Sequence, residues 1–249
     1  MAQDLAPLKM KLALASRNET SLQELAVSVR EVGSSPLVLP TDVTDPQQCQ
    51  VLVDKATEKF GSLDYLILSA GLSMWTRFDQ IRHTDIFQRL MEVNYLGAVY
   101  CIQASLKHLK RCQGMIVAIS SIQGRIGVPQ HSGYAASKHA LDGFLETLLT
   151  ELNGEVRILN VMPGWIQGTQ LRNRALSGDG NPLGQGHGRS HKQGISVQEC
   201  SSRIIRSMEG TGGNLYIPRL MGLLPWLRLL LPGVLRSRIQ RAVEKQAED

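Results

Sequence analysis

The chain has 249 residues, of which 43% are hydrophobic and 20% charged, a composition that suits one folded domain and excludes a disordered or collagen-like chain. Four cysteines without a Cys-x-x-Cys pair predict reduced thiols and no metal site. The net charge of +5 is mild, and no basic stripe runs through the whole chain, which excludes a typical nucleic-acid-binding protein.

The N-terminal residues predict neither a signal peptide nor a membrane anchor, because Asp4 comes early and no long apolar stretch follows it. No charge-free apolar run approaches the roughly 18–20 residues that a membrane-spanning helix needs. We therefore expect a soluble, intracellular domain.

Short apolar runs typical of strands alternate along the chain with longer stretches of helical periodicity. The strand-like runs are residues 12–15, 37–39, 63–68, 115–119, 156–161 and 214–217. The helical stretches are residues 22–32, one opened by Asp45-Pro46, one within 83–111, and residues 133–152 and 196–208. This alternation predicts the α/β class, with a doubly wound parallel sheet covered on both faces. In such sheets ligands bind beyond the carboxyl ends of the strands.

Residues 177–194 are the most loop-like stretch of the sequence. A flexible surface insertion and a lid over the site both remain open as interpretations, since long loops in compact domains are often lids. The glycines in this stretch fit neither of the common phosphate-binding motifs.

Tyr134 and Lys138 stand four residues apart in the helical stretch 133–152, so their side chains share one face. A free phenol, with a pKa of about 10, is a poor base near neutrality, but a nearby ammonium favours the phenolate and lowers that pKa. Such a pair can pass a proton to or from an alcohol or carbonyl oxygen. Ser121 follows the strand-like run 115–119, where its hydroxyl can hydrogen-bond the same oxygen.

These motifs together resemble the short-chain dehydrogenase/reductase family. The matching segments are Ile119-Ser120-Ser121, Tyr134-Ala135-Ala136-Ser137-Lys138, Val93-Asn94-Tyr95-Leu96-Gly97, Asp42-Val43-Thr44-Asp45, Ser69-Ala70-Gly71 and Pro163-Gly164-Trp165-Ile166. The resemblance covers residues 11–217. Within the family, residues 177–217 resemble the dehydrogenase/reductase member 7 and 7B group, which is close to the 11β-hydroxysteroid dehydrogenase type.

The resemblance implies a role for each matched residue. Tyr134 would be the general acid/base, and Lys138 would lower its pKa and hold the nicotinamide ribose. Ser121 would orient the substrate oxygen, and Asn94 would support a water in the proton relay. The implied cofactor contacts are Ser16, Arg17, Asp42, Val43, Ala70, Gly71, Tyr134, Lys138, Pro163, Gly164 and Ile166.

Two further residues bear on the ligands. Arg17 follows the first strand-like run with no carboxylate before Glu19, and a guanidinium there suits the 2′-phosphate of NADP, so NADP(H) is favoured over NAD(H). A solvated turn residue is the alternative for Arg17. His131 either lines the substrate pocket or is an ordinary loop histidine.

The family pattern places a further βα unit, with Thr-Gly-x-x-x-Gly-x-Gly, before residue 12. Residues 1–10 contain no glycine and no strand-like run. We therefore expect the doubly wound sheet to lack its first βα unit, with strands 12–15 and 63–68 flanking an unfilled position and keeping unpaired backbone groups. Ser69, where the family has Asn, and Gly168, where it often has Thr, are two further departures.

The C-terminal residues 216–249 combine clustered leucines and Trp226 with six basic and three acidic side chains. This pattern is typical of a segment that lies on a membrane surface, with Pro225 and Pro232 interrupting any single helix. A dimer contact or a cover over the substrate pocket explains the same pattern equally well. We predict a catalytic domain over residues 1–217 and a basic, apolar tail over 218–249.

The sequence therefore predicts an NADP-dependent oxidoreductase that interconverts a secondary alcohol and a ketone, on a lipid or steroid substrate. The alternative is a catalytically impaired, truncated member of the family that acts through binding. The resemblance further implies a homo-oligomer, located in the cytoplasm or on the endoplasmic reticulum membrane.

Overall fold

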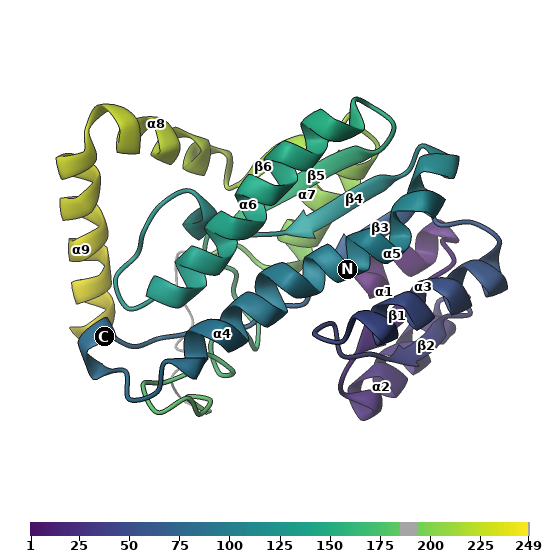
Figure 1. Cartoon of the computed structure of the whole chain (residues 1–249), viewed down its shortest axis with the longest axis horizontal. Coiled ribbons are helices and arrows are strands. Elements are labelled where there is room, and N and C mark those ends of the chain that lie inside the picture. The colour runs from purple at the N-terminus through teal and green to yellow at the C-terminus, as the bar shows by residue number, and fades with distance from the viewer. Residues whose placement is uncertain (185–193, 249) are drawn as a thin grey trace.

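The computed structural model describes residues 1–184 and 194–248, with side chains up to residue 243. Parallel strands form the centre of the molecule, and helices cover both of their faces (Figure 1). The strands are β1 (Ala13–Ser16), β2 (Leu37–Pro40), β3 (Tyr65–Leu68), β4 (Met115–Ile119), β5 (Arg157–Pro163) and β6 (Gly213–Ile217). The α/β prediction is confirmed, and every strand-like run of the sequence forms a strand.

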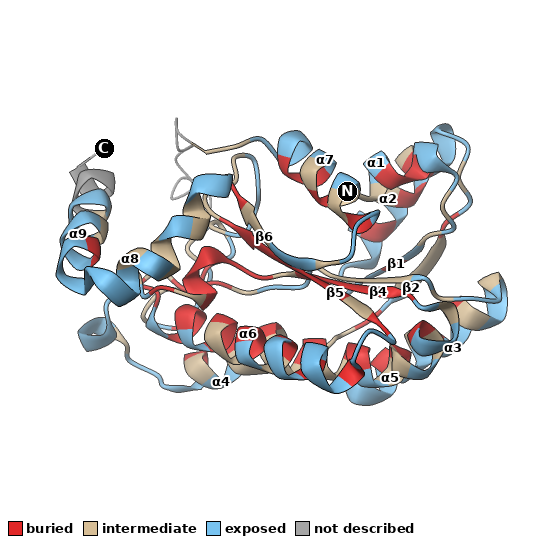
Figure 2. Cartoon of the chain, turned by 90° about the horizontal axis from the view of Figure 1, so that it is seen from above, coloured by how far each residue is buried: buried red, intermediate tan, exposed pale blue. Residues whose placement is uncertain are grey.

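The helices form two layers, which are seen on opposite sides of the sheet in Figure 2. One layer contains α1 (Ala2–Leu5), α2 (Glu19–Glu31) and α7 (Val197–Met208). The other contains α3 (Pro46–Phe60), α4 (Asp85–Met91), α5 (Gly97–Cys112) and α6 (Ser132–Leu152). The expected helix start at Asp45-Pro46 is confirmed, because the Asp45 side chain accepts hydrogen bonds from the backbone N–H groups of Gln47 and Gln48.

The strands form two sheets rather than one. β1 pairs in parallel with β2, and the second sheet has the order β3-β4-β5-β6 with every pair parallel. Within the described residues, no strand pairs with the remaining edge of β1 or of β3. The expected break in the sheet between β1 and β3 is therefore present. The strands are still parallel, and helices still cover both faces.

The helical region predicted within residues 83–111 is divided in the structure. α4 runs into a π turn, Glu92–Leu96, and the chain then continues as α5. A π turn widens the helix by one residue and is often found at functional sites. Here it carries Asn94, whose side chain hydrogen-bonds the backbone of Leu72 and the hydroxyl of Ser137.

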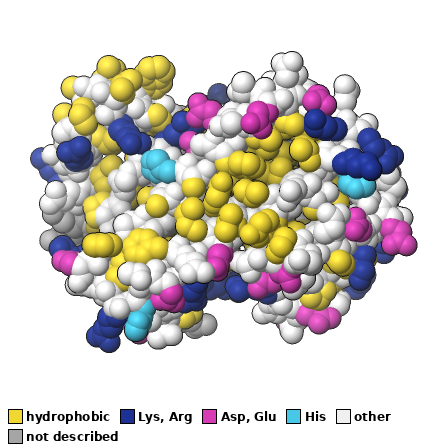
Figure 3. Space-filling view, viewed as in Figure 1, with side chains coloured by type: hydrophobic (Ala, Val, Ile, Leu, Met, Phe, Trp, Pro, Cys, Tyr) yellow, Lys and Arg dark blue, Asp and Glu magenta, His cyan; other side chains and the backbone are white. Residues whose placement is uncertain are grey.

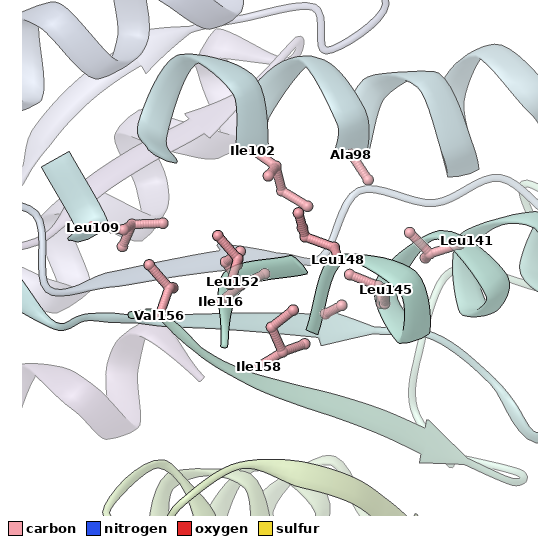
Figure 4. Packing of buried hydrophobic residues seen from close by; sticks show 11 residues of the cluster. Ala98, Ile102, Leu109, Ile116, Leu141, Leu145, Leu148, Leu152, Val156 and Ile158 are labelled. Carbon is pink, nitrogen blue, oxygen red and sulfur yellow. The ribbon is translucent and has the colours of Figure 1, made fainter. Parts of the chain in front are cut away.

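The largest buried cluster lies between α5, α6 and the strands β4 and β5 (Figure 4). Ile102, Leu109, Ile116, Leu145 and Ile158 are its central members, each at most 3% exposed. β4 is buried along nearly its whole length because helices cover both of its faces. All four cysteines are free thiols, as predicted.

The C-terminal segment forms a 3-10 turn, Arg219–Leu223, followed by the helices α8 (Leu224–Leu230) and α9 (Pro232–Glu248). We call residues 219–243 the C-terminal arm. Leu235 anchors the arm by packing, buried, against Ile122 and Ile126. In the described part of the chain, no helix combines the length and the apolar character needed to cross a bilayer.

Candidate active site

A cavity of about 480 Å³ opens beyond the carboxyl ends of β3, β4 and β5. Its wall includes eight of the residues predicted as catalytic or cofactor-binding: Ala70, Gly71, Ser121, Tyr134, Lys138, Pro163, Gly164 and Ile166. These residues come together because parallel strands end at one edge of the sheet, and α6 begins beside that edge. The predicted location of the site is the location of the cavity.

Tyr134 and Lys138 lie on the inward face of α6, where they are 6% and 3% exposed. The Lys138 Nζ donates a hydrogen bond of 3.0 Å to the carbonyl oxygen of Ile119 and lies 5.9 Å from the centre of the Tyr134 ring. Ser121 follows β4, and its hydroxyl oxygen accepts a hydrogen bond of 3.2 Å from the backbone N–H of Gln123. The three side chains line one wall of the cavity.

The pKa of Tyr134 corrects one expectation. Burial raises this pKa to about 12, although a hydrogen bond with Ser121 acts in the opposite direction. Burial also lowers the pKa of Lys138 to about 8. Desolvation penalises the charged form of both groups, and this outweighs the expected attraction between ammonium and phenolate. In the ligand-free chain the phenol is therefore protonated at neutral pH and is a proton donor.

Asn94 lies behind the cavity rather than in its wall. Its Oδ1 accepts a hydrogen bond of 2.7 Å from the backbone N–H of Leu72, and its Nδ2 donates to the Leu72 carbonyl at 2.8 Å. Nδ2 also donates to the Ser137 hydroxyl at 2.9 Å. Asn94 thus ties the segment after β3 to α6, and so fixes the position of the helix that carries Tyr134.

The predicted contacts to the adenine half of a cofactor lie outside the cavity. Ser16 ends β1 and Arg17 follows it, while Asp42 and Val43 follow β2, and none of them is among the cavity-lining residues. The Arg17 guanidinium is 71% exposed and lies 3.9 Å from the Asp42 carboxylate. The structure therefore gathers the residues predicted for the nicotinamide side into one cavity. It places those predicted for the adenine side on separate segments, where Ser16 and Arg17 are exposed and Asp42 and Val43 are half-buried.

Two buried polar groups at the cavity fit the hydroxyls of a nicotinamide ribose. The Lys138 ammonium has three N–H donors and one acceptor, the Ile119 carbonyl, among the hydrogen bonds of the described structure. The buried Ser120 hydroxyl has no hydrogen-bond partner there. Buried polar groups are normally hydrogen-bonded, so unused capacity at this place favours a polar ligand. The nicotinamide side of the site therefore fits the cofactor that the sequence motifs imply.

The sequence reasoning missed several residues of the cavity. Trp75 and Arg172 belong to no motif, and Trp165 was noted only as the variable position of its segment. The arm supplies Met221, Leu224, Ile239, Ala242 and Val243, so the interpretation of the tail as a pocket cover is confirmed. Helical spacing of apolar residues in the tail was the one available signal, and it did not show which surface they would cover.

His131 lies in the cavity wall, 4% exposed, so the pocket-lining interpretation is confirmed. One of its ring nitrogens, Nδ1, lies 2.8 Å from the Pro129 carbonyl oxygen, and burial lowers the pKa of this histidine. Residues 185–193 of the predicted loop lie outside the described residues, so neither interpretation of that loop is tested.

The sequence profile described as short chain dehydrogenase matches residues 1–179. The 11-beta-hydroxysteroid dehydrogenase 1A of Arabidopsis thaliana is 37% identical over 202 residues, which are 79% of this chain and 58% of the relative. The 11-beta-hydroxysteroid dehydrogenase A of Arachis hypogaea is 32% identical over 240 residues, 90% of this chain and 66% of the relative. The chain thus spans less than two thirds of the length of both relatives.

Solved structures share the fold. A short chain dehydrogenase/reductase from Burkholderia phymatum, determined with NAD, matches with a TM-score of 0.78 and 24% identity over 91% of this chain and 86% of its own. An alcohol dehydrogenase from Thermococcus sibiricus, determined with 5-hydroxy-NADP, matches with a TM-score of 0.73 and 24% identity over 86% of this chain and 88% of its own. At this level of identity the likeness establishes the architecture.

Proposed function

The chain belongs to the short-chain dehydrogenase/reductase family, and on that premise we propose that it interconverts a secondary alcohol and a ketone with NADP(H). The observation that carries the proposal is the buried Ser121, Tyr134 and Lys138 constellation in the wall of the cavity. A bound nicotinamide supplies or accepts the hydride, and the residues of this chain handle the substrate oxygen and its proton.

In the direction of reduction, the substrate carbonyl oxygen lies against Tyr134 and Ser121. As hydride reaches the carbonyl carbon, charge develops on this oxygen, and the Tyr134 hydroxyl transfers its proton to it. The raised pKa of Tyr134 keeps the phenol protonated and ready to donate. The Ser121 hydroxyl donates a hydrogen bond to the same oxygen, which orients the substrate. The products are the alcohol and a phenolate.

The Lys138 ammonium stabilises that phenolate and, with a nicotinamide cofactor bound, would hold its ribose hydroxyls. Because its pKa of about 8 lies above neutrality, Lys138 is mostly charged at pH 7. Asn94 acts indirectly, since its three hydrogen bonds fix the position of the loop after β3 relative to α6. Arg17 at the end of β1 carries the proposed preference for NADP, because its guanidinium suits a 2′-phosphate.

A titration with NADPH, followed by turnover of a ketone, tests the proposal. We expect NADPH to quench the fluorescence of Trp75 and Trp165, which line the cavity, and the chain to oxidise NADPH when a hydrophobic ketone is added. Cofactor binding without turnover of any ketone would refute the catalytic proposal.

The second candidate function is binding without catalysis. The observation that favours it is the separation of β1–β2 from the larger sheet, together with the exposed position of Arg17. In the same titration, absence of NADPH binding at millimolar cofactor would select this candidate.

We also propose that the arm rests on an anionic membrane surface. Its outward side chains include Leu220, Trp226 and Leu229, which are 76%, 63% and 72% exposed, and Figure 3 shows hydrophobic and basic side chains gathered over α8 and α9. Apolar side chains beside arginines are typical of helices that lie in the interface of anionic lipid.

Flotation with phosphatidylserine-containing vesicles tests the membrane proposal. We expect the chain to float with the vesicles, and the variant with Trp226→Ser, Leu229→Ser and Leu230→Ser to remain in the vesicle-free fraction. A variant with Val27→Ser and Val51→Ser, two exposed residues far from the arm in the sequence, is the control. Equal flotation of all three proteins would refute a lipid contact. So would a triple variant that still binds vesicles but no longer forms a dimer that the unchanged chain forms.

A further inference from the structure

The imidazole ring of His131 is held in one orientation in the wall of the cavity. The backbone N–H of His131 donates to the Val128 carbonyl at 3.3 Å, and its carbonyl oxygen accepts from the N–H of Ala135, in the first turn of α6, at 2.8 Å. The ring lies edge-on to the indole of Trp75, with 4.9 Å between ring centres. Because the side chain is only 4% exposed, its close-packed surroundings leave the ring little freedom to turn.

One hydrogen bond determines which ring nitrogen carries the proton. Nδ1 of His131 lies 2.8 Å from the carbonyl oxygen of Pro129, and a carbonyl oxygen can only accept. Nδ1 therefore carries the proton, and Nε2 of the neutral ring carries a lone pair. Burial lowers the pKa of His131, and the positive charge of Arg172 acts in the same direction, so the ring is neutral at pH 7. Nε2 is thus a hydrogen-bond acceptor.

This acceptor is open to the cavity. Among the residues that the structure describes, no group donates a hydrogen bond to Nε2 of His131. Nε2 is also not one of the fully enclosed side-chain atoms that lack a partner, and His131 belongs to the cavity wall. A ligand in the cavity can therefore reach the lone pair and donate a hydrogen bond to it.

Gln123 is a second polar residue of the same wall with unused accepting capacity. It lies in the 3-10 turn Ile122–Gly124, and its buried Oε1 has no hydrogen-bond partner in the described part of the chain. The oxygen of a substrate carbonyl satisfies neither acceptor, because that oxygen itself accepts. Since buried polar groups are normally hydrogen-bonded, the wall favours a ligand that also brings a donor. The ring centres of His131 and Tyr134 are 6.4 Å apart, so a donor at His131 lies near the reacting oxygen.

We propose that Nε2 of His131 accepts a hydrogen bond from a substrate hydroxyl beside the reacting carbon. The substrate is then an α-hydroxyketone in the direction of reduction and a vicinal diol in the direction of oxidation. This inference rests on the proposed function in one respect, which is that the cavity is the substrate site. His131 acts on specificity and takes no part in proton transfer. A ketone without the hydroxyl displaces water from Nε2 and leaves the lone pair unpaired, which penalises its binding.

Two other interpretations of His131 lead to different outcomes. In the first, the ring only fills space between Trp75 and Tyr134, and its removal affects every ligand of the cavity alike. In the second, Nε2 accepts from the carboxamide N–H of a bound nicotinamide, and its removal weakens cofactor binding. A hydroxyl-specific acceptor affects only the ligands that carry the O–H donor.

Three ligands with the same cyclohexyl body separate these interpretations: cyclohexyl methyl ketone, cyclohexyl hydroxymethyl ketone and cyclohexyl methoxymethyl ketone. The methoxy ligand keeps the second oxygen but has no O–H donor. The readout is the fluorescence of Trp75 and Trp165 in a Trp226→Phe background, which removes the exposed indole of α8. It gives dissociation constants without cofactor or turnover, and NADPH is titrated separately.

The variants keep or remove the acceptor. His131→Phe keeps a ring at this position and removes the lone pair, whereas His131→Gln keeps an acceptor on a side chain of similar reach. His83→Phe is the matched control, since it makes the same substitution at an exposed histidine outside the cavity wall.

We expect the hydroxymethyl ketone to bind about 3- to 10-fold more tightly than the other two ligands, the range that corresponds to one hydrogen bond between neutral groups. His131→Phe should abolish this preference and leave the affinity for the methyl ketone unchanged, which shows that its cavity is intact. His131→Gln should keep part of the preference, and His83→Phe all of it. The affinity for NADPH should be the same with and without the His131 acceptor.

The proposal is overturned if the unchanged chain does not prefer the hydroxymethyl ketone, or if the methoxymethyl ketone shares the preference. It is also overturned if His131→Phe keeps the preference, weakens all three ligands equally, or weakens NADPH instead. A preference that depends on His131, in a chain that reduces no ketone, would refute the proposed function and leave this specificity site standing. Turnover of the ketones without such a preference would do the reverse.

Discussion

The two sheets of the molecule differ in how firmly they are built into it. β4 and β5 are buried along nearly their whole length, and the largest apolar cluster packs against them. In the smaller sheet only Leu14 of β1 is buried, and no residue of β2 is. β3, at the edge of the larger sheet, is likewise only half-buried. Among the residues that the structure describes, no strand pairs with the second edge of β1 or of β3, and this leaves both apolar strands partly open to solvent.

The smaller sheet is joined to the rest of the molecule by side-chain packing rather than by strand pairing. α3 packs on α5, where the Cys49 and Cys101 sulfur atoms lie 3.6 Å apart. Gly97 permits this approach, since a Cβ there would lie 2.8 Å from a methyl group of Val43. The residues proposed for proton transfer thus lie beside the well-packed sheet, with Ser121 just after β4 and with Tyr134 and Lys138 on α6. The residues proposed for the adenine half lie at the ends of the strands of the weakly joined sheet.

The largest expected effect tests whether proton transfer depends only on the residues beside the well-packed sheet. Tyr134→Phe removes the proton donor, and we expect kcat for ketone reduction to fall about 10³-fold, within the range for loss of a general acid. NADPH affinity should change little, because the ring remains. Tyr100→Phe, on α5, is the control and should keep full activity. Equal turnover in the Tyr134→Phe variant would contradict the proposed mechanism.

The next effect compares the two sheets directly through their stability. Ile116→Ala in β4 removes a fully buried side chain, and we expect the free energy of unfolding in urea to fall by about 3–4 kcal/mol. Leu14→Ala in β1 should cost about 2 kcal/mol, the lower end of the range for a buried leucine, because its neighbours in the strand are exposed and can relax around the cavity. Equal losses at the two positions would contradict the contrast between the sheets.

A third effect is the pH dependence that the buried Lys138 introduces. Its pKa is about 8 in the folded chain and about 10.4 in an unfolded one, so between these values the unfolded chain binds more protons. Stability should therefore rise with pH in this window, on the order of 2 kcal/mol from pH 8 to pH 10 relative to Lys138→Met. Lys110→Met, at a surface ion pair, should keep the slope of the unchanged chain. Parallel curves for the unchanged chain and Lys138→Met would show that this lysine is not desolvated.

The smallest effect probes the smaller sheet. Arg17→Ala should weaken NADPH binding about fivefold and leave NADH binding unchanged, because an exposed charge pair with a phosphate is worth about 1 kcal/mol in water. Arg30→Ala, in the last turn of α2, serves as the control. If NADPH and NADH weaken together, Arg17 supports the loop and does not read the 2′-phosphate.

The sequence predicted the strands and the catalytic constellation because local signals determine both. Apolar runs with clear ends define β4 and β5, and the spacing of Tyr134 and Lys138 on a helix fixes their common face. The π turn at residues 92–96 was not predicted, because its stabilising bonds come from Leu72 and Ser137, which are distant in the chain.

The misjudged features depend on tertiary packing. The pKa of Tyr134 was expected to fall, but its direction is set by desolvation, which no spacing of residues reveals. Arg172 and Trp75 are 97 positions apart and meet only through the fold. The arm gave a visible amphipathic pattern, yet only the structure shows that one side of it closes the cavity.

The π turn has a consequence for how this chain tolerates change. In an α-helix each residue advances the side-chain direction by about 100°, so one extra residue rotates everything that follows it by that angle. Asn94 faces Leu72 and Ser137, and Ile102 faces the core, only with the extra residue in place. The length of segment 92–96 is thus more strictly constrained than the identity of its residues. A substitution there alters single contacts. Deleting one residue would rotate either Asn94 away from Leu72 and Ser137 or the apolar face of α5 away from the core.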